Sequence, residues 1–321
     1  MTSPRSPRFI QCHHADSAAD RAQAIAALVG TPASASPKHF YDRLGSHLFE
    51  AITELPEYYP TRTEAAIFAQ HGAQMAQHIG VGGTLLDLGA GNCVKAERLF
   101  PLLEPRRYVA IDISADFLHE ALRRVQREHP QLDTVGLGLD FSSTLDLPDG
   151  LMGDGPPVFF YPGSSIGNFT PEDALAFLKS VHAKANGGGL LIGVDLVKPH
   201  GILQAAYDDA IGVTAAFNRN LLRRLNELIG SDFDPAQWDH VGLYNAELSR
   251  IEMHLQARCG ITVNWPDGQR AFARGERLHT ENSYKYTLDG FADLLLQAGF
   301  ALPMQWTDEQ GWFGVFWAPA G

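Results

Sequence analysis

Two glycines and two acidic residues stand where the chain could hold the adenosine part of a ligand. Gly89 and Gly91 directly follow the apolar stretch TLLDL, and glycines there allow a tight turn and close approach of the backbone. Asp112 ends the next apolar stretch, where a carboxylate can accept hydrogen bonds from both ribose hydroxyls. Asp140 ends a third, where it can accept a hydrogen bond from an adenine amino group. The alternative is that both acids only cap the helices that follow.

The residues after the glycine turn favour one class of adenosine ligand. A dinucleotide fingerprint requires glycine or alanine at position 94, but this chain has Val94. The pattern GxGN therefore favours S-adenosylmethionine over NAD. Lys95, on the first turn of the next helix, could bind the methionine carboxylate, although a solvated helix lysine would give the same pattern. Asp87, inside the first strand, is expected to orient the loop.

These residues belong to a regular alternation of strands and helices that begins at Thr84. Strands are predicted at TLLDL, YVAIDIS, VGLGLDFS, PVFFY and LLIGVDLV. Helices are predicted between them, including KAERLFPLL and one capped by Thr170. Such alternation predicts a parallel sheet with right-handed crossovers. A helix at 288–300 and two strands joined by a turn from Asp308 to Gly311 complete an α/β, Rossmann-like, seven-stranded class I methyltransferase domain.

Residues 198–286 interrupt this alternation and predict a second, α+β, substrate-binding domain. The insert contains a helical region at about 199–228, followed by the strands RIEMHLQAR and GITVNW. Further helices are predicted at 16–29, at 39–55, and from Thr61 or Thr63 to about 78. The predicted boundaries are 61–197 and 287–321 for the methyltransferase domain, 16–60 and 198–286 for the substrate-binding domain, and 1–15 for a loose N-terminal arm.

The composition restricts the partners that the chain can bind. Its 321 residues carry a net charge of −12 without a run of Lys or Arg, so neither nucleic acid nor an anionic membrane surface is an expected partner. No apolar stretch is long enough to span a bilayer, and no signal peptide is recognisable. We therefore expect a cytoplasmic protein, and an acidic surface without an evident apolar helix face favours a monomer. Cys12, His13 and His14 have metal-ligand chemistry, but in a loose arm they are not expected to form a metal site.

Several longer segments resemble one family. They are LPEYYPTRTE (55–64), FFYPGSSIGNF (159–169), AAYDDAIGVTAAFNRN (205–220), RIEMHLQAR (250–258) and HTENSYKY (279–286). From about residue 38 to its end, the chain is similar to the L-histidine Nα-methyltransferases of ergothioneine biosynthesis. This resemblance implies trimethylation of L-histidine to hercynine, with three molecules of S-adenosylmethionine as methyl donors.

The resemblance also implies which residues form the site. Cofactor contacts are implied at Tyr41, Gly89, Lys95, Asp112 and Asp140. Substrate contacts are implied at Tyr58, Gly163, Asn168, Tyr207, Met253, Glu281 and Ser283. Of these, Tyr41 and Asn168 are assigned to the catalytic step.

The side chains of the implied substrate residues suit a free amino acid. The Asn168 amide can donate to the substrate carboxylate or accept from its amine, and the Tyr207 phenol can donate to the carboxylate. Glu281 and Ser283 alternate along a predicted strand, so they face one side and could bind an imidazole N–H. Met253 could cover the imidazole ring with its sulfur. The alternatives are a turn residue at Asn168, a packing tyrosine at Tyr207, an exposed charge at Glu281 and a core residue at Met253.

Methyl transfer to nitrogen requires a neutral amine, because an ammonium group has no lone pair. Tyr41 or Tyr58 could assist by accepting a hydrogen bond or by facing the cation with its ring. If the proton is lost to water, no dedicated base is needed, and the rate comes from alignment of nitrogen, methyl and sulfur. No metal is required.

Three other functions account for parts of the sequence. The same scaffold could methylate tryptophan, tyrosine or a thiol-bearing histidine, but the pair Met253 and Glu281 favours histidine. An NAD-dependent oxidoreductase is disfavoured by Val94 and by the lack of a His/Arg/Asp set for hydride transfer. A non-catalytic binding module would not explain Asn168, Glu281 and both cofactor acids in one chain.

Overall fold

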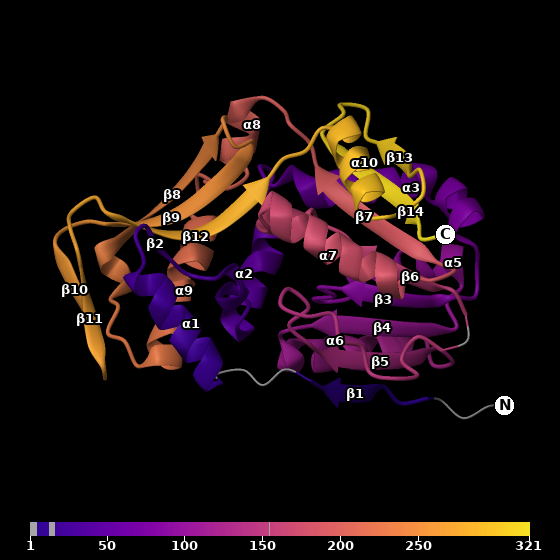
Figure 1. Ribbon diagram of the computed structural model, residues 1–321, viewed down its shortest axis with the longest axis horizontal. Helices are drawn as coiled ribbons and strands as arrows, with labels where there is room; N and C mark the ends of the chain where they lie inside the picture. Colours follow the sequence, from indigo (N-terminus) through magenta and orange to yellow (C-terminus); the bar gives the residue numbers. More distant parts are fainter. Residues whose placement is uncertain (1–4, 13–16, 154) are drawn as a thin grey trace. The chain divides into compact units, whose positions relative to one another are not determined.

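The chain forms two compact units (Figure 1). The computed structural model describes residues 5–12, 17–153 and 155–321. The first unit comprises Met1–His13, Pro60–Val197 and Lys285–Gly321, and the second comprises His14–Tyr59 and Lys198–Tyr284. Lys285 and Tyr286 thus belong to the first unit and not to the predicted insert. Tyr286 forms a parallel bridge with Leu196, and its ring packs edge-on against Phe291.

An eight-stranded sheet forms the first unit, in the order β1-β5-β4-β3-β6-β7-β14-β13. All neighbours are parallel except β14, which is antiparallel to both β7 and β13. The strands are β1 (Arg8–Gln11), β3 (Thr84–Leu88), β4 (Arg107–Asp112), β5 (Asp133–Gly138), β6 (Pro157–Tyr161), β7 (Gly189–Asp195), β13 (Met304–Thr307) and β14 (Phe313–Pro319). The seven strands predicted from the sequence are therefore present, with β1 added at one edge.

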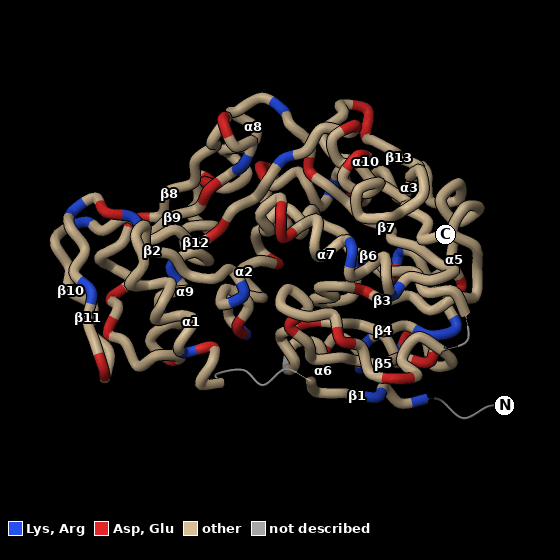
Figure 2. The backbone as a smooth tube through the Cα atoms, viewed as in Figure 1, with Lys and Arg blue, Asp and Glu red and all other residues tan. Residues whose placement is uncertain are grey.

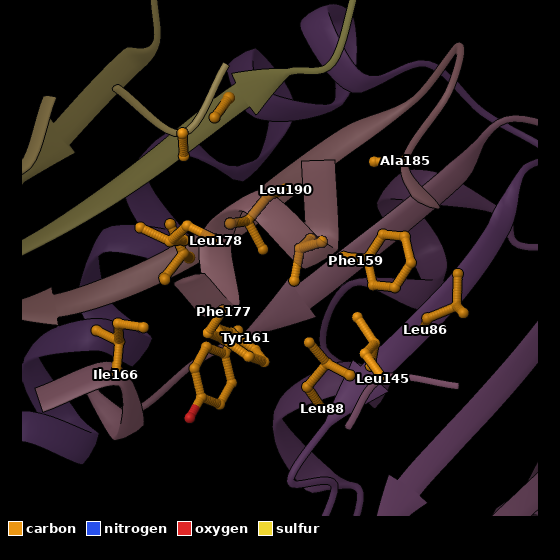
Figure 3. Packing of buried hydrophobic residues seen from close by; sticks show 14 of the residues in the cluster. Leu86, Leu88, Leu145, Phe159, Tyr161, Ile166, Phe177, Leu178, Ala185 and Leu190 are labelled. Atoms are coloured by element: carbon orange, nitrogen blue, oxygen red, sulfur yellow. The ribbon is translucent and has the colours of Figure 1, made fainter. Parts of the chain in front are cut away.

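Helices cover both faces of this sheet. They are α3 (Tyr59–Ile79), α4 (Val94–Glu97), α5 (Phe100–Leu103), α6 (Ala115–Glu128), α7 (Pro171–Lys184) and α10 (Leu288–Gln297). Successive strand residues point to opposite faces, so Leu86 and Phe159 pack with Leu178 of α7 (Figure 3), whereas Leu85 packs with Ile67 of α3. Burial on both faces explains why the central strands are mostly apolar.

The predicted loose arm at residues 1–15 is wrong where the structure describes it. Arg8–Gln11 form β1, which pairs in parallel with Val135–Gly138 of β5. Phe9 lies over Gly136, where a Cβ atom would come within 2.6 Å of its ring. The lack of a side chain at Gly136 of β5 therefore makes room for the Phe9 ring of the added strand. Cys12 is exposed, and His13 and His14 lie outside the described residues.

Several predicted helix boundaries change for local reasons. KAERLFPLL forms two short helices, α4 and α5, because Pro101 lacks the N–H that would continue the first one. α3 begins at Tyr59 and not at Thr61 or Thr63. Thr170 is confirmed as the cap of α7, since its hydroxyl accepts a hydrogen bond from the Asp173 N–H at 3.2 Å.

A four-stranded sheet in the order β2-β12-β9-β8 forms the centre of the second unit, with a separate hairpin of β10 and β11. The strands are β2 (Ala33–Ser34), β8 (Trp238–Asn245), β9 (Arg250–Ala257), β10 (Ile261–Trp265), β11 (Gly268–Phe272) and β12 (Arg277–Tyr284). The helices are α1 (Ala18–Val29), η1 (Pro37–Phe40), α2 (Arg43–Thr53), α8 (His200–Ala205), α9 (Val213–Ile229) and η3 (Pro235–Gln237). Helix α9 contacts α2, β8 and β9.

Two carboxylates divide helices that the sequence predicted as continuous. The stretch 39–55 becomes η1 and α2 because Asp42 caps α2, accepting a hydrogen bond from the Gly45 N–H at 2.6 Å. The stretch 199–228 becomes α8 and α9. There, Asp209 accepts hydrogen bonds from the N–H groups of Val213 and Thr214, at 2.9 and 2.7 Å.

Lys and Arg are scattered among Asp and Glu along both units (Figure 2). Among the helices that the structure describes, none has the length and apolar character needed to cross a membrane.

Candidate active site

The glycine turn after β3 is joined to the acid that ends β4. Gly89 and Gly91 both have positive φ, +73° and +51°, which glycine adopts without strain. The Gly91 N–H donates to Asp112 Oδ2 at 2.9 Å, and the Ser114 N–H donates to Asp112 Oδ1 at 2.8 Å. Burial raises the pKa of Asp112. Backbone N–H groups thus hold both oxygens of the Asp112 carboxylate in place at the end of β4.

The backbone of the glycine turn is open beside this carboxylate. A Cβ atom at Gly91 would meet no heavy atom within 4 Å, so the backbone is open at this point. At Gly89, the nearest atom to such a Cβ is on the Phe141 ring, at 3.6 Å. An open turn next to Asp112, at the carboxyl end of a parallel sheet, is where α/β proteins bind nucleosides.

Asp140 and Asp87 are both buried, and each accepts a hydrogen bond within the first unit. The contact of Asp140 with adenine stays a prediction. Asp140 follows β5 and accepts hydrogen bonds from the backbone N–H and the hydroxyl of Ser142, so its carboxylate shapes its own turn. Asp87 accepts a hydrogen bond from the Tyr108 hydroxyl at 2.7 Å, and burial raises the pKa of Asp87 to about 7. Asp87 therefore joins β3 to β4.

Lys95 and Gly163 are both held by a residue that the sequence analysis missed. Glu64 on α3 is buried, and its carboxylate accepts from the Lys95 ammonium and from the Gly163 N–H, each at 2.7 Å. Glu64 is the last residue of the segment LPEYYPTRTE, but nothing in its spacing identified a partner.

Asn168 ends the turn that follows β6. Gly163 and Ser164 both have positive φ, +76° and +59°, and η2 (Ser165–Asn168) comes next. Ser164 is held in this conformation by Gly193 O, which accepts from its N–H, and by the Asp195 N–H, which donates to its hydroxyl at 2.8 Å. Asn168 is half-buried, and no hydrogen bond of its side chain occurs among the described residues.

In the second unit, one face of the sheet carries the residues predicted to bind imidazole. Glu281 on β12 is the register partner of Met253 on β9, and Ser283 is the partner of Ile251. The register shifts at Thr280, whose hydroxyl donates to Met253 O at 3.0 Å. This bulge leaves Glu281 and Ser283 on the buried face, as their alternation predicts. Met253 is 2% exposed, so it is also part of the packed face.

Aromatic residues of the second unit lie together with Ser283. The Tyr207 hydroxyl is 2.8 Å from Ser283 Oγ, and the Tyr207 ring meets Tyr58 edge-on. Tyr41 follows η1 and packs edge-on against Phe49, which in turn packs edge-on against Tyr58. Tyr41 thus belongs to the same unit as five of the predicted substrate residues, Tyr58, Tyr207, Met253, Glu281 and Ser283. The predicted substrate residues Gly163 and Asn168 and the other predicted cofactor residues belong to the first unit. Phe49 is not among the residues that the sequence predicted for the site.

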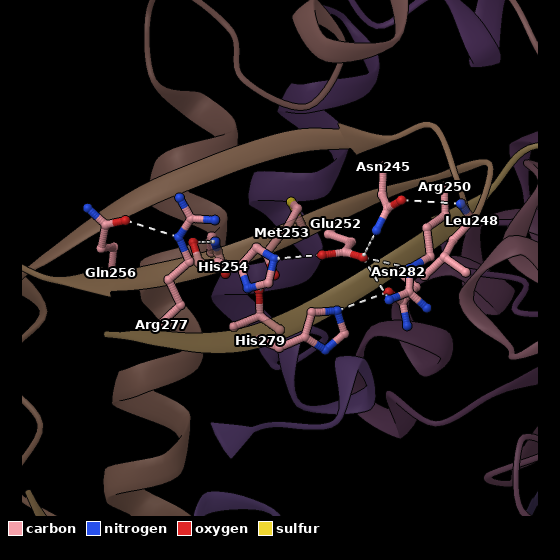
Figure 4. A network of polar contacts seen from close by, with 12 residues as sticks. Asn245, Leu248, Arg250, Glu252, Met253, His254, Gln256, Arg277, His279 and Asn282 are labelled. Atoms are coloured by element: carbon pink, nitrogen blue, oxygen red, sulfur yellow. Dashed lines mark hydrogen bonds and ion pairs between the residues drawn. The ribbon is translucent and has the colours of Figure 1, made fainter. Parts of the chain in front are cut away.

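The opposite face of the same sheet carries a polar network (Figure 4). Glu252 accepts hydrogen bonds from Asn245 and Arg250 and lies 3.1 Å from His254 Nε2. Burial raises the pKa of Glu252, but these three hydrogen bonds outweigh it and hold the pKa at about 2. Burial lowers the pKa of His254 to about 4. The two faces of β9 and β12 therefore differ sharply, with Glu252 and Glu281 on opposite sides.

The sheet order, the glycine turn after β3 and the acid at the end of β4 together define a class I S-adenosylmethionine-dependent methyltransferase. A solved structure supports the fold: an S-adenosylmethionine-dependent methyltransferase from Clostridium acetobutylicum, 12% identical, aligns with a TM-score of 0.51 over 86% of this chain and 98% of its own. Residues 20–320 match the model of a family described as histidine-specific, S-adenosylmethionine-dependent methyltransferases. The chain belongs to this family.

Two relatives extend the comparison. A histidine N-alpha-methyltransferase from Mycolicibacterium smegmatis is 39% identical over 94% of this chain and 95% of its own length. The ergothioneine biosynthesis protein 1 of Neurospora crassa is 32% identical over 83% of this chain, which matches 31% of that longer protein. S-adenosylmethionine is therefore the methyl donor, in agreement with the prediction from Val94.

Proposed function

We propose that this enzyme transfers three methyl groups from S-adenosylmethionine to the α-amino nitrogen of L-histidine, and that the hercynine formed enters ergothioneine biosynthesis. The observation that carries the choice of substrate is the face of β9 and β12, where Glu281 is paired with Met253 in register and Ser283 is next to Tyr207. The names of the relatives support the same reaction.

The buried carboxylate of Glu281 is the proposed partner of an imidazole N–H. A charge-assisted hydrogen bond of this kind distinguishes imidazole from a purely apolar ring, which cannot supply the N–H. Met253 would lie against the flat face of the ring. The hydroxyls of Ser283 and Tyr207 lie next to each other. Tyr207 would donate a hydrogen bond to the substrate carboxylate, and Ser283 would bind the imidazole together with Glu281.

In the first unit, Asp112 would hold the ribose and Lys95 the methionine carboxylate of the donor. When bound, S-adenosylmethionine supplies an electrophilic sulfonium methyl. Asn168, whose amide can both donate and accept, would hold the amino-acid group of the substrate. Tyr41 and Tyr58 would assist loss of the amine proton, or face the ammonium with their rings. The chemical step then depends on alignment of the neutral amine with the methyl.

Mass spectrometry tests this proposal. The purified protein is incubated with S-adenosylmethionine and an equimolar mixture of the twenty amino acids. Consumption of histidine alone, with a product heavier by three methyl groups, is the expected result. Methylation of tryptophan or tyrosine at a comparable rate would refute the role of Glu281 and Met253 in selecting histidine. It would leave the fold and the methyl donor unaffected. That the enzyme acts as a cytoplasmic monomer stays a prediction.

A further inference from the structure

One buried carboxylate connects a predicted cofactor residue with a predicted substrate residue. Glu64, on α3, is 1% exposed. Its Oε2 accepts from the Lys95 ammonium, and its Oε1 accepts from the Gly163 N–H, both at 2.7 Å. Lys95 follows β3 and Gly163 follows β6, the strand beside it in the sheet. A single side chain thus connects the segments that leave the carboxyl ends of two neighbouring strands.

Two glycines leave room for the contacts of Glu64. A Cβ atom on Gly163 would lie 2.8 Å from Lys95 Nζ, closer than real contacts allow. A Cβ atom on Gly193 of β7 would overlap Glu64 Oε1. A side chain at either position would therefore displace the ammonium or the carboxylate. The contacts of Glu64 thus involve residues that follow β3 and β6, and they depend on the lack of a side chain at a glycine within β7.

A carboxylate that is almost fully buried must receive strong hydrogen bonds, since its loss of hydration is costly. Glu64 receives one from an ammonium and one from a backbone N–H. Lys95 keeps 32% of its side chain exposed, so its ammonium has donors available toward a ligand carboxylate. Glu64 itself has almost no exposed surface, so any effect on a ligand must pass through its two partners.

We propose that Glu64 is a positioning residue of the methyl-transfer reaction. Its carboxylate fixes the Lys95 ammonium for the methionine carboxylate of the donor. It also fixes the Gly163 turn, and through that turn Asn168, for the amino-acid substrate. The claim about the Gly163 turn and the amino-acid substrate rests on the proposed function. The claim about Lys95 depends only on the binding of S-adenosylmethionine.

The substitution Glu64→Gln tests this role with little change in volume. The carboxylate is acceptor-only, and both of its partners are donors. An amide has one acceptor and one donor group, so either orientation places a donor against a donor. We expect the affinity for S-adenosylhomocysteine, measured by calorimetry, to fall about ten-fold or more, and the KM for histidine to rise by a similar factor.

Asp133→Asn is the matched control. Asp133 accepts from Arg107 Nε at 2.7 Å, so this variant also removes one carboxylate charge from a short ion pair of the same unit. It lies at the first residue of β5, the amino end of the sheet. Asp133→Asn should lower the melting temperature while the affinity for S-adenosylhomocysteine and the KM for histidine stay unchanged.

A second variant keeps the test decisive if Glu64→Gln does not fold. Glu64→Asp retains the charge, but its side chain is one methylene shorter and cannot keep both contacts, so it should reduce the same two parameters. Unchanged affinity and KM in either folded variant, with only a lower melting temperature, would overturn the proposal. If the wild-type protein binds S-adenosylhomocysteine but does not methylate histidine, the proposed function fails, and the affinity comparison still decides whether Glu64 positions Lys95.

Discussion

Replacing Glu281 with alanine should weaken histidine binding far more than S-adenosylhomocysteine binding. Glu281 is 8% exposed and lies opposite Met253 on the packed face of β12 and β9. If its carboxylate accepts a hydrogen bond from the imidazole, the variant loses a bond to a charged group, worth about 1.5–3 kcal/mol. This corresponds to a rise in the Kd for histidine of about ten- to 150-fold.

Calorimetric titration of histidine, in the presence of saturating S-adenosylhomocysteine, measures this effect. Glu281→Gln keeps an acceptor of nearly the same size and removes only the charge, so its loss should be smaller than that of Glu281→Ala. The affinity for S-adenosylhomocysteine, measured separately, should change little in both variants, because the proposed donor contacts at Asp112 and Lys95 are in the other unit.

Glu252→Ala provides the control on the same sheet. Glu252 is the register neighbour of Asn282 and lies on the opposite face, where Arg250 and Asn245 donate to it. This variant should lower the melting temperature and leave the Kd for histidine unchanged. Equal losses of affinity for histidine and for S-adenosylhomocysteine in Glu281→Ala, or an equal effect of Glu252→Ala, would refute the assignment of Glu281 to imidazole.

Two further predictions concern the donor site and the pH dependence of folding. Asp112→Ala removes the ribose acceptor and its bond to Gly91, so S-adenosylhomocysteine affinity should fall about ten-fold or more by calorimetry, and an unchanged affinity would contradict the ribose assignment. His254 has a pKa of about 4 in the folded state, below its ordinary 6.5, so the unfolded chain takes up the proton first. Neutral His254 therefore makes its full contribution to the free energy of unfolding above pH 6.5. As the pH falls toward 4, the free energy of unfolding decreases by about 2 kcal/mol on account of His254, after allowance for screening. Urea unfolding at about pH 7 and about pH 4.5 gives the loss of unfolding free energy on acidification. This loss should be smaller for His254→Gln than for the wild type, and equal losses would contradict the assignment.

The central sheet could be predicted because its strands are buried on both faces. Strands such as Val109–Ile111 and Phe159–Tyr161 are uninterrupted apolar runs, and their alternation with helices sets the topology. β1 could not be predicted, because RFIQ has no strand pattern of its own. It is stabilised by its partner β5 and by the space that Gly136 leaves for Phe9.

The acids of the donor site could be predicted because parallel strands end at one edge of a sheet. Asp112 is therefore placed by topology alone. Glu64 is 31 residues from Lys95 and 99 from Gly163, and no local pattern predicts contacts at such separations. The bulge at Thr280, which sets the face on which Glu281 lies, also depends on pairing with β9. The substrate residues came from the resemblance to a family and not from spacing.

The position of the methyl groups on the product is the most direct test of the proposed reaction. Histidine labelled with ¹⁵N only at its α nitrogen is converted by the enzyme with S-adenosylmethionine, and the product is examined by NMR and fragment-ion mass spectrometry. The proposed reaction predicts that all transferred methyl groups are on the labelled nitrogen and that the imidazole is unmodified. Methylation of a ring nitrogen would contradict it, because the proposed site holds the imidazole at Glu281 and presents the amine to the donor.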